Sequence, residues 1–399
     1  MHSIALIGIS GFARTHLFLA MEQMAQGRAR LVAATVINQR EEAFLCSRLR
    51  SAGCAIHAST EEMWSEWKGK IDLCMIPTGI PYHAPMVIEA LRAGAHVFVE
   101  KPLATTTDEV ARIIAAEEET GKRVAVGFQD VYRSETQMIK RRLSAGEFGR
   151  LHSATVLGLW PRPPDYYARN GWVGRLRLDN GLNAFDSPVS NAFAHFINLA
   201  LYWASPSPAE TAAVDSLEAS LWRAQPIESF DTVALHAGLN TGAELFAYFS
   251  HACAEVRDAT VGLETEKALI KWTHLKRCDI IWRERAASRP DEHIKLLGPM
   301  ETRLSMMDAV MGWLAGSGDF VCTAAMARAH AGLVERLHAS TPIHDMSGEA
   351  LAPAGAPGAS TRVIRDIERV FQRAAEKRLM PGQACGRWLK TAVPEPVGA

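Results

Sequence analysis

The chain has few of the residues that mark a disulfide-rich or metal-binding protein. Its seven cysteines are scattered over 399 residues, odd in number, and form no Cys-x-x-Cys pair. Neither a disulfide framework nor a zinc knuckle is therefore indicated, and a reducing compartment is favoured. No His-Glu-x-x-His or similar ligand spacing occurs, so no metal is expected.

Long apolar runs and an excess of one charge are also missing. The formal net charge is −1 with both signs interspersed, so we expect neither a nucleic-acid partner nor an anionic membrane surface. No run of about 18 uninterrupted apolar residues occurs, which argues against a spanning helix. The apolar N-terminus lacks a basic region and is interrupted by glycines and Arg14, unlike a signal peptide. The expectation is a cytoplasmic protein.

The first third of the chain alternates short apolar runs with helical patterns. Near-continuous apolar character is typical of strands that are covered on both faces. Strand–helix alternation over six strands predicts an α/β fold with a doubly wound, parallel Rossmann sheet. The six runs are residues 3–9, 30–37, 54–59, 71–76, 96–99 and 123–128.

After about residue 130 the pattern changes to period-two alternation, as in "TVALHAGL". Several such strands predict an α+β domain with one large, open, mostly antiparallel sheet. The stretch "GEALAPAGAPGAS" (348–360) is typical of a linker, and a helix near 361–378 should dock on the body or on a neighbour. We therefore expect a dinucleotide-binding domain at 1–130, a substrate-binding and oligomerisation domain at 131–345, and a linker with a helical tail at 346–399.

The stretch "GISGFA" (8–13) follows the first strand and opens the first helix. A glycine loop at this position lets backbone amides and a helix N-terminus hold a pyrophosphate. Gly8 would make the tight turn, Ala13 takes the helix-packing position, and Ser10 replaces the second glycine of the usual motif. The residues expected at a dinucleotide are Gly8, Ser10, Gly11, Phe12, Ala13, Asn38, Arg40, Pro77, Thr78, His83, Glu100 and Lys101.

The end of the second strand bears on the choice between NAD and NADP. An acidic residue there would bind the ribose 2′-hydroxyl, but the chain has Val36 at this position, followed by Asn38 and Arg40. A missing carboxylate removes repulsion against a 2′-phosphate, and an arginine can pair with one. This favours NADP over NAD, although Arg40 could equally face solvent on the next helix.

Lys101 follows the fifth strand in "HVFVEKPLA". The carboxyl ends of parallel strands are where ligands bind in open α/β sheets. Pro102 restricts Lys101 to an extended conformation, and the Lys–Pro bond could be cis. Beside a substrate hydroxyl and a cationic nicotinamide, the lysine pKa would fall, so that Lys101 could exchange a proton with the hydroxyl.

The segments "GISGFARTH", "HAPMVIEALRAGAHVFVEKPLA" and "VGFQDVYR" resemble the Gfo/Idh/MocA family of oxidoreductases, over roughly residues 1–345. The resemblance implies that Lys101 lies at the nicotinamide and the substrate. It also implies oxidation or reduction of a hydroxyl on a sugar, cyclitol or related compound, with the C-terminal sheet used for substrate binding and oligomer contacts.

A second candidate element is "DNGLNAFDSPVSNAFAHFINLALYW". A helix starting at Ser187 and Pro188 would place Asn191, His195 and Asn198 on one polar face. By the resemblance, His195 matches a histidine that assists proton transfer. The family aspartate corresponds to Asn191 or to Asp186, depending on whether one counts from His195 or from Gly181, and both remain candidates.

The segment "LWPRPPDYYARNGWVG" (159–174) combines aromatic rings and arginines in a proline-studded loop, a candidate substrate lid. Aromatic faces stack on sugar C–H surfaces, and arginines bind hydroxyls or a carboxylate. The expected substrate-binding residues are Lys101, Gln129, Tyr132, Trp160, Arg162, Tyr166, Tyr167, Arg169, Trp172 and Asn198.

Three functions fit this sequence. The favoured one is an NAD(P)-dependent dehydrogenase or reductase acting on CH–OH groups of a small sugar-like substrate. The second keeps the site but cleaves a glycoside without net redox change, and the third is a dinucleotide-sensing regulator without catalysis. A homo-oligomer, dimer or tetramer, is expected because the exposed face of a large sheet usually needs covering.

Overall fold

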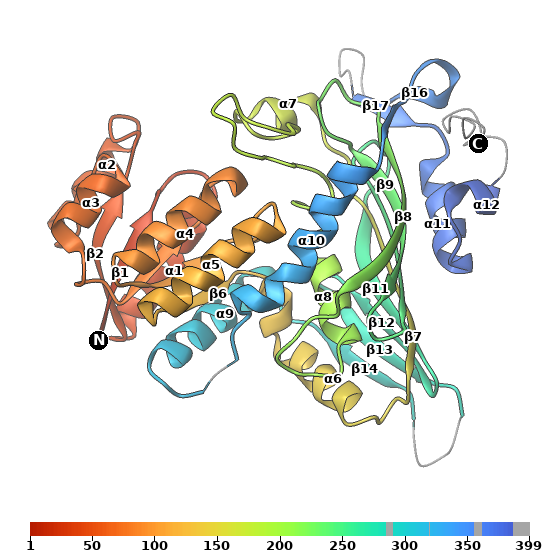
Figure 1. Cartoon of the computed structure of the whole chain (residues 1–399), viewed down its shortest axis with the longest axis horizontal. Coiled ribbons are helices and arrows are strands. Elements are labelled where there is room, and N and C mark those ends of the chain that lie inside the picture. The colour runs from red at the N-terminus through yellow and green to blue at the C-terminus, as the bar shows by residue number, and fades with distance from the viewer. Residues whose placement is uncertain (285–289, 319, 355–360, 386–399) are drawn as a thin grey trace. The chain divides into compact units, whose positions relative to one another are not determined.

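The computed structural model describes residues 1–284, 290–318, 320–354 and 361–385 (Figure 1). The chain forms two compact units. The first comprises residues 1–133 and 299–328, and the second comprises 134–298 and 329–399. The expected boundaries differ from these units. Residues 299–328, which had been assigned to the substrate domain, belong to the first unit, and residues 346–399, expected as a separate linker and tail, belong to the second. No helix in the described ranges is long and apolar enough to cross a membrane.

The first unit is built on a six-stranded parallel sheet in the order β3-β2-β1-β4-β5-β6. This is the strand order of the dinucleotide-binding Rossmann fold, as the alternation of strands and helices predicts. The central strands are buried, since helices cover both faces, whereas the edge strand β3 is only half-buried. The strands are β1 (His2–Ile7), β2 (Ala29–Thr35), β3 (Ala55–His57), β4 (Leu73–Ile76), β5 (His96–Val99) and β6 (Val124–Val126).

The helices of this unit begin and end where local chemistry dictates. Thr106 and Glu109 form a reciprocal capping box at the start of α5, and Gly121 ends that helix in the left-handed conformation. The helices are α1 (Ala13–Ala25), α2 (Ala43–Ser51), α3 (Thr60–Trp67), α4 (His83–Arg92) and α5 (Thr107–Thr120), with short 3-10 turns η1 (Ile80–Tyr82) and η2 (Gln129–Tyr132).

A later segment completes the first unit. Helix α9 (Pro299–Leu314) joins it through Asp308, whose carboxylate accepts hydrogen bonds from Gln23 and Arg28. The Cys322 carbonyl then accepts a hydrogen bond from the amide of Val126 in β6. Edge pairing and long-range polar contacts of this kind have no local sequence signature, which is why residues 299–328 were assigned to the other domain.

The second unit contains a nine-stranded, mostly antiparallel sheet in the order β14-β13-β12-β11-β7-β10-β9-β8-β15. Only the pairs β7–β10 and β8–β15 are parallel. The strands are β7 (Leu151–Leu159), β8 (Val214–Arg223), β9 (Thr232–Leu239), β10 (Glu244–Ser250), β11 (Arg257–Thr265), β12 (Ala268–Thr273), β13 (Arg277–Trp282), β14 (Glu292–Lys295) and β15 (Ile343–Asp345).

Helices cover both faces of this sheet, and β10 shows how. Successive side chains of a strand point to opposite faces, so Phe249 stacks on Phe193 beside α8 while Tyr248 contacts Phe371 of α11. The helices of the unit are α6 (Ser134–Ser144), α7 (Pro164–Ala168), α8 (Ala194–Ala204), α10 (Ala324–Ser340, which begins in the first unit), α11 (Ile367–Lys377) and α12 (Pro381–Cys385).

The C-terminal segment packs on the face of the sheet that carries the Tyr248 side chain (Figure 1). Residues 348–354, expected to be linker, form the turn η3 (Gly348–Ala350) and strand β16 (Leu351–Ala354), which pairs with β17 (Thr361–Ile364). Residues 355–360 of that stretch lie outside the described part. The chain thus covers part of its own sheet. The homo-oligomer was expected because that sheet face would otherwise be exposed, and the oligomeric state remains a prediction.

Candidate functional site

The glycine loop between β1 and α1 has the backbone that dinucleotide binding needs. Gly8 and Gly11 adopt φ angles of 92° and 56°, values that residues with a Cβ rarely accept. A Cβ on Gly8 would lie 3.7 Å from that of Ala13. The first turn of α1 has no side-chain cap at Phe12. Within the described residues, the Gly11 and Phe12 amides have no hydrogen-bond acceptor, so this loop fits a pyrophosphate.

The end of β2 lies against the glycine loop. The Asn38 amide hydrogen-bonds to Ser10 Oγ at 3.0 Å, which explains how serine is accommodated in place of the second glycine. Val36 is buried, whereas Arg40 is exposed and forms no ion pair in the described structure. The sequence reasoning overlooked Glu42, which pairs with Arg14 at 3.0 Å; hydrogen bonding to Arg14 lowers the pKa of this carboxyl. The edge is therefore not purely basic.

Lys101 stands at the carboxyl end of β5 in a turn held by buried groups. The Lys101–Pro102 bond is cis. Glu100 accepts a hydrogen bond from the Lys101 amide at 3.0 Å and contacts His16 Nε2 at 2.9 Å. Burial would raise the pKa of Glu100, but the hydrogen bond and charge of His16, with Lys101, lower it overall. The carboxylate is thus charged at neutral pH.

His16 was not anticipated from the sequence. It lies on α1 and is buried, and its ring packs 5.3 Å from that of Phe98 in β5. The only available signal was a histidine on the apolar face of the first helix, a pattern more typical of an ordinary core position. Its importance depends on contact with Glu100, 84 residues away.

A second buried histidine holds the other side of the turn. His83 Nδ1 lies 2.6 Å from the Pro102 carbonyl, and Nε2 lies 3.1 Å from the Thr78 carbonyl. Burial lowers the pKa of His83, so the ring is neutral and can donate to only one of these acceptors. His83 therefore links the segments after β4 and β5. Its predicted contact with a cofactor remains a prediction, as do those of Pro77 and Thr78.

Gln129 and Tyr132 are buried in η2. The Tyr132 hydroxyl donates to the Val126 carbonyl at 2.9 Å and accepts from the Cys322 amide at 3.0 Å. Burial raises the pKa of Tyr132 well above its usual value. These contacts give Tyr132 a structural role, and its contact with substrate remains a prediction.

In the second unit, the structure brings the two alternative acid positions together. Asn191 Nδ2 donates to Asp186 Oδ1 at 2.9 Å, and the Gly174 amide donates to Asp186 Oδ2 at 2.7 Å. Asp186 is buried, and Asn191 is half-buried. The sequence had treated these residues as alternatives, whereas they form one hydrogen-bonded pair.

The predicted start of the helix was wrong by six residues. Residues 188–193 form turns, and α8 begins only at Ala194. The Phe193 amide donates to the Pro188 carbonyl five residues back, which is wider than an α-helical turn. Asn191 therefore precedes the helix and does not share a helical face with His195 and Asn198.

His195 is the only residue of α8 that is not buried. Its side chain is therefore accessible to a ligand, as the predicted role requires. Asn198, one turn further along, is fully buried. Neither its amide nitrogen nor its oxygen has a hydrogen-bond partner in the described structure. Burying an unsatisfied amide is costly, so Asn198 calls for an explanation beyond packing.

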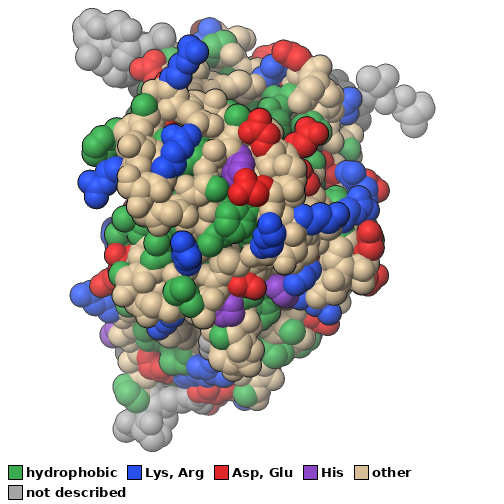
Figure 2. All heavy atoms as spheres, turned by 90° about the vertical axis from the view of Figure 1, so that its left-hand side faces the viewer, with side chains coloured by type: hydrophobic (Ala, Val, Ile, Leu, Met, Phe, Trp, Pro, Cys, Tyr) green, Lys and Arg blue, Asp and Glu red, His purple; other side chains and the backbone are tan. Residues whose placement is uncertain are grey.

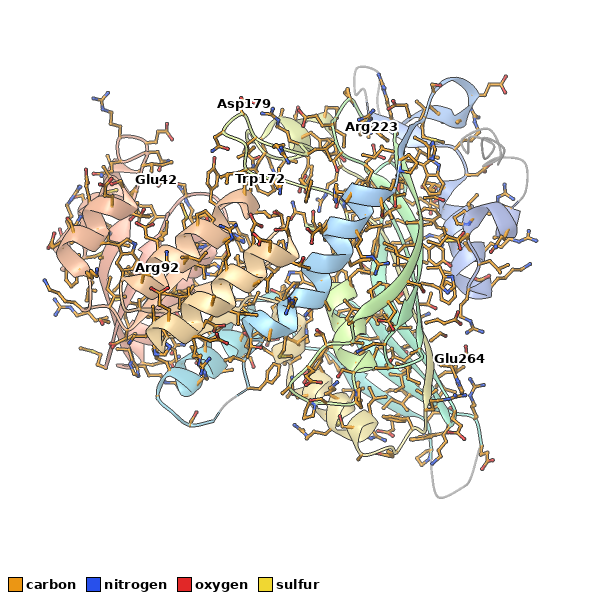
Figure 3. All side chains as sticks on the ribbon, viewed as in Figure 1. Glu42, Arg92, Trp172, Asp179, Arg223 and Glu264 are labelled. Carbon is orange, nitrogen blue, oxygen red and sulfur yellow. The ribbon has the colours of Figure 1, made fainter. Side chains whose placement is uncertain are left out.

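The aromatic loop packs on the same residues. The ring centroids of Trp160 and Phe193 lie 4.6 Å apart, and the Tyr166 hydroxyl accepts a weak hydrogen bond of 3.4 Å from Asn191 Nδ2. Tyr167 contacts Tyr166 edge-on, and burial raises its pKa. Trp172 is half-buried on the same long segment (Figure 3).

His251 and Asp231 were also overlooked. Burial, reinforced by Arg162 and Arg169, lowers the pKa of His251 to about 3, so this ring is neutral. Burial raises the pKa of Asp231 to about 6 despite hydrogen bonds from two backbone amides. Asp231 directly precedes β9 and His251 directly follows β10, and neither belonged to a motif in the sequence.

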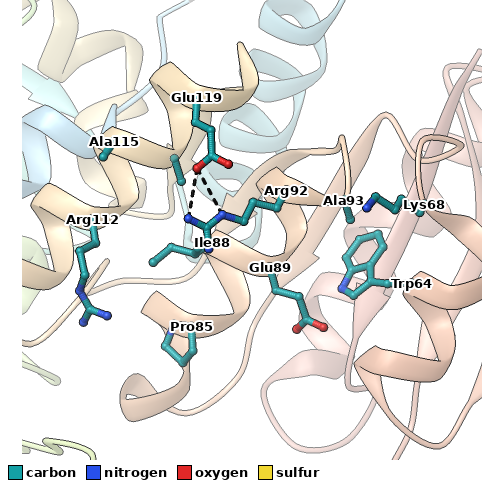
Figure 4. Close-up of a pocket in the computed structure, with 11 residues that line it drawn as sticks. Trp64, Lys68, Pro85, Ile88, Glu89, Arg92, Ala93, Arg112, Ala115 and Glu119 are labelled. Atoms are coloured by element: carbon teal, nitrogen blue, oxygen red, sulfur yellow. Dashed lines mark hydrogen bonds and ion pairs between the residues drawn. The ribbon is translucent and has the colours of Figure 1, made fainter.

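A hollow on the first unit lies apart from this chemistry. It is formed by side chains of α3, α4 and α5, among them Trp64 and Ile88, and is bordered by the exposed ion pair of Arg92 and Glu119 (Figure 4). None of the predicted site residues lines it.

On the face of Figure 2, basic and acidic side chains are interspersed. No cluster suited to a metal ion occurs in the described ranges.

Residues 2–128 match the Gfo/Idh/MocA family, described as an oxidoreductase family with an NAD-binding Rossmann fold. Through this unit, the chain is similar to the Gfo/Idh/MocA family. Its glycine loop, Glu100, Lys101 and Pro102 lie within the matched residues. The structural and family matches thus agree on which unit carries the dinucleotide-binding fold.

Individual relatives match only part of the chain. The chain is 30% identical to the oxidoreductase YrbE of Bacillus subtilis over 37% of this chain and 43% of that protein. It is 29% identical to inositol 2-dehydrogenase of Azotobacter vinelandii over 50% of this chain and 53% of that protein. The chain thus spans about half or less of these curated relatives.

The fold extends over both units. The WlbA dehydrogenase of Chromobacterium violaceum, solved with NADH and UDP-GlcNAcA, superposes with a TM-score of 0.69 at 23% identity. The match covers 85% of this chain and 93% of that structure. At this identity the likeness establishes the architecture alone.

Proposed function

We propose that the protein is an NAD(P)-dependent oxidoreductase that transfers a hydride between a nicotinamide and a hydroxyl-bearing carbon of a sugar, cyclitol or related compound. The observation that carries the proposal is the turn of Lys101. It lies at the ligand edge of a Rossmann sheet, and two buried histidines fix the residues on either side of it. Such rigid support suits a group that must meet a reacting atom.

Each side chain has a distinct role in this proposal. When bound, the nicotinamide supplies the hydride acceptor or donor. Lys101 exchanges the proton of the substrate hydroxyl, and His195 assists that transfer. The Asp186–Asn191 pair orients the sugar. The Asp186 carboxylate accepts hydrogen bonds from Asn191 and the Gly174 amide, which hold it in place. Its remaining lone pairs can accept a hydrogen bond from a sugar hydroxyl.

NADP is the favoured cofactor because Val36 removes the usual carboxylate and Arg40 is exposed without an ion pair in the described structure. NAD remains the alternative, because Glu42 lies near the same edge and pairs with Arg14. Fluorescence titrations with NADPH and with NADH distinguish the two. We further propose a cytoplasmic homo-oligomer, which light scattering after size exclusion tests.

The test of catalysis is Lys101→Met, compared with Lys68→Met at an exposed position of the same unit. We expect K101M to lose hydride transfer to a sugar and polyol panel while binding NADPH or NADH normally, and K68M to resemble wild type. Unchanged turnover in K101M contradicts the role. Sugar release from a glycoside without net cofactor reduction identifies the redox-neutral alternative, and cofactor binding without any chemistry identifies a sensor.

A further inference from the structure

Two arginines of the aromatic loop share one tyrosine ring. The guanidinium carbon of Arg169 lies 4.0 Å from the centroid of Tyr166, and that of Arg162 lies 4.5 Å from it. A guanidinium this close to an aromatic ring is attracted to it, and its several N–H groups leave donors for a further acceptor. The ring therefore presents two sets of donors at one place.

Neither arginine forms an ion pair within the part of the chain that the structure describes, because neither has a carboxylate oxygen within 4.0 Å. Arg175, in the same long segment, contrasts with them, because it pairs with Asp179 at 2.8 Å and with Glu228 at 3.2 Å. Two like charges close together repel. The buried Asp186 acts on the same Tyr166, but its carboxylate accepts hydrogen bonds from Asn191 and the Gly174 amide.

One of the donors is already withdrawn from water. Arg162 Nε is buried without a hydrogen-bond partner in the described residues, although a buried donor normally has one. The backbone of Arg162 is fixed by a hydrogen bond of 3.1 Å from its amide to the His251 carbonyl. The arginine is thus held in place with an unsatisfied donor, an arrangement suited to a ligand.

The arginines are connected to the candidate catalytic pair within the same unit. Tyr166, on which both stack, is hydrogen-bonded through its hydroxyl to Asn191, which in turn binds Asp186. A ligand held at the arginines would extend towards the residues proposed to orient the reacting sugar. Their positive field also acts on the neighbouring His251, whose pKa it helps to lower.

Building on the proposed function, we propose that Arg162 and Arg169 bind an oxyanion, a carboxylate or a phosphate, carried by the substrate. The substrate is then an acidic or phosphorylated sugar derivative rather than a neutral sugar or cyclitol. Arginine forms paired, charge-assisted hydrogen bonds with either group. An anionic group on the substrate therefore explains why two arginines meet here, because recognition of neutral hydroxyls requires no positive charge.

The test uses the full-length protein and two matched ligand pairs, D-glucuronate with D-glucose, and uridine diphosphate with uridine. Tryptophan fluorescence reports binding, since Trp160 lies 6.0 Å from the Arg162 guanidinium. We expect at least one anion to bind about tenfold or more tightly than its neutral partner, and salt to weaken this preference. The pair that shows it tells carboxylate from phosphate.

The double variant R162Q/R169Q should lose that preference about tenfold or more, whereas R177Q should keep it. Arg177 lies in the same segment, is exposed and contacts Asn183 instead of Tyr166. R169Q alone, at an exposed position, should show a partial loss without a folding defect. The comparison with wild type separates this site from anion binding at the glycine loop.

Equal binding of anionic and neutral partners by the wild type overturns the proposal, as does an unchanged preference in the double variant. Failure of the proposed function is distinguishable. In that case NADH or NADPH is not consumed or formed with any sugar, whereas failure of the anion site leaves hydride transfer with neutral sugars intact.

Discussion

Replacing Glu100 tests the central structural claim about the Lys101 turn. In E100Q, the amide oxygen can accept from the Lys101 amide while its NH2 group faces His16 Nε2. His16 can adapt by carrying its proton on Nδ1, an atom that has no partner in the described structure. E100A instead leaves the His16 ring and the Lys101 amide both unpaired in a buried place.

The two substitutions should therefore differ in cost. Hydrogen bonds to a charged acceptor contribute about 1.5–3 kcal/mol each and neutral ones about 1 kcal/mol, part of which the relieved burial of the charge offsets. We expect E100Q to lower the free energy of unfolding by about 1–2 kcal/mol. E100A, with two orphaned donors, should lower it by about 3 kcal/mol. Urea denaturation measures both.

The pH dependence supplies a second readout. The folded pKa of Glu100 is lowered from 4.5, so its charge stabilises the fold above the unfolded pKa, and that contribution is lost as the pH falls through the folded pKa. The gap between wild type and E100Q should be full at pH 7 and shrink below about pH 4.5. E119Q, at the exposed pair with Arg92, should change stability by less than about 1 kcal/mol at any pH. Equal costs for E100Q and E100A, or a gap independent of pH, would refute the reasoning.

Three further predictions concern other residues. Asn198→Leu should stabilise the fold by up to about 1–3 kcal/mol, because it removes a buried, unsatisfied amide. If that amide binds substrate, the variant should also lose turnover at least about tenfold. A lower melting temperature in N198L would show that the amide is already satisfied. Tyr248→Phe removes hydrogen bonds to the carbonyls of Ala374 and Leu379, so it should cost about 1 kcal/mol and speed proteolysis of the C-terminal helices, whereas no change would argue that these helices do not depend on the sheet. Arg40→Ala should weaken NADPH binding about fivefold and leave NADH binding unchanged, as measured by fluorescence titration beside an R48A control; equal loss for both cofactors would exclude recognition of the 2′-phosphate.

Some features could be predicted because they depend on residues near one another in the chain. The glycine loop follows its strand directly, and Lys101 follows β5 directly. Strand–helix alternation fixes which strand ends share an edge, so the placement of the glycine loop and of Lys101 at one edge of the sheet followed from the sequence. The strand of residues 232–239 was likewise predicted with its observed bounds, because alternation over eight residues is a strong local signal.

Other features depended on contacts between distant segments. His16 on α1 looked like a core residue until the fold placed it against Glu100. The start of α8 was predicted too early because Ser187 and Pro188 form a valid cap, but the hydrogen bonds among residues 185–193 favour turns instead. The sequence predicted that a helix near 361–378 docks on the body or on a neighbour, but not which, since its apolar face does not specify a partner; the structure packs α11 on the sheet.

The sequence by itself thus determined the Rossmann sheet, its glycine loop and the position of Lys101, because periodicity and strand order are local properties of the chain. Only the tertiary structure decided that Asp186 and Asn191 form a pair, that two histidines hold the Lys101 turn, and that two arginines meet on one tyrosine. The physical reason is that hydrogen bonds and ring contacts are satisfied by whichever groups the fold brings within about 3–5 Å, whatever their separation along the chain.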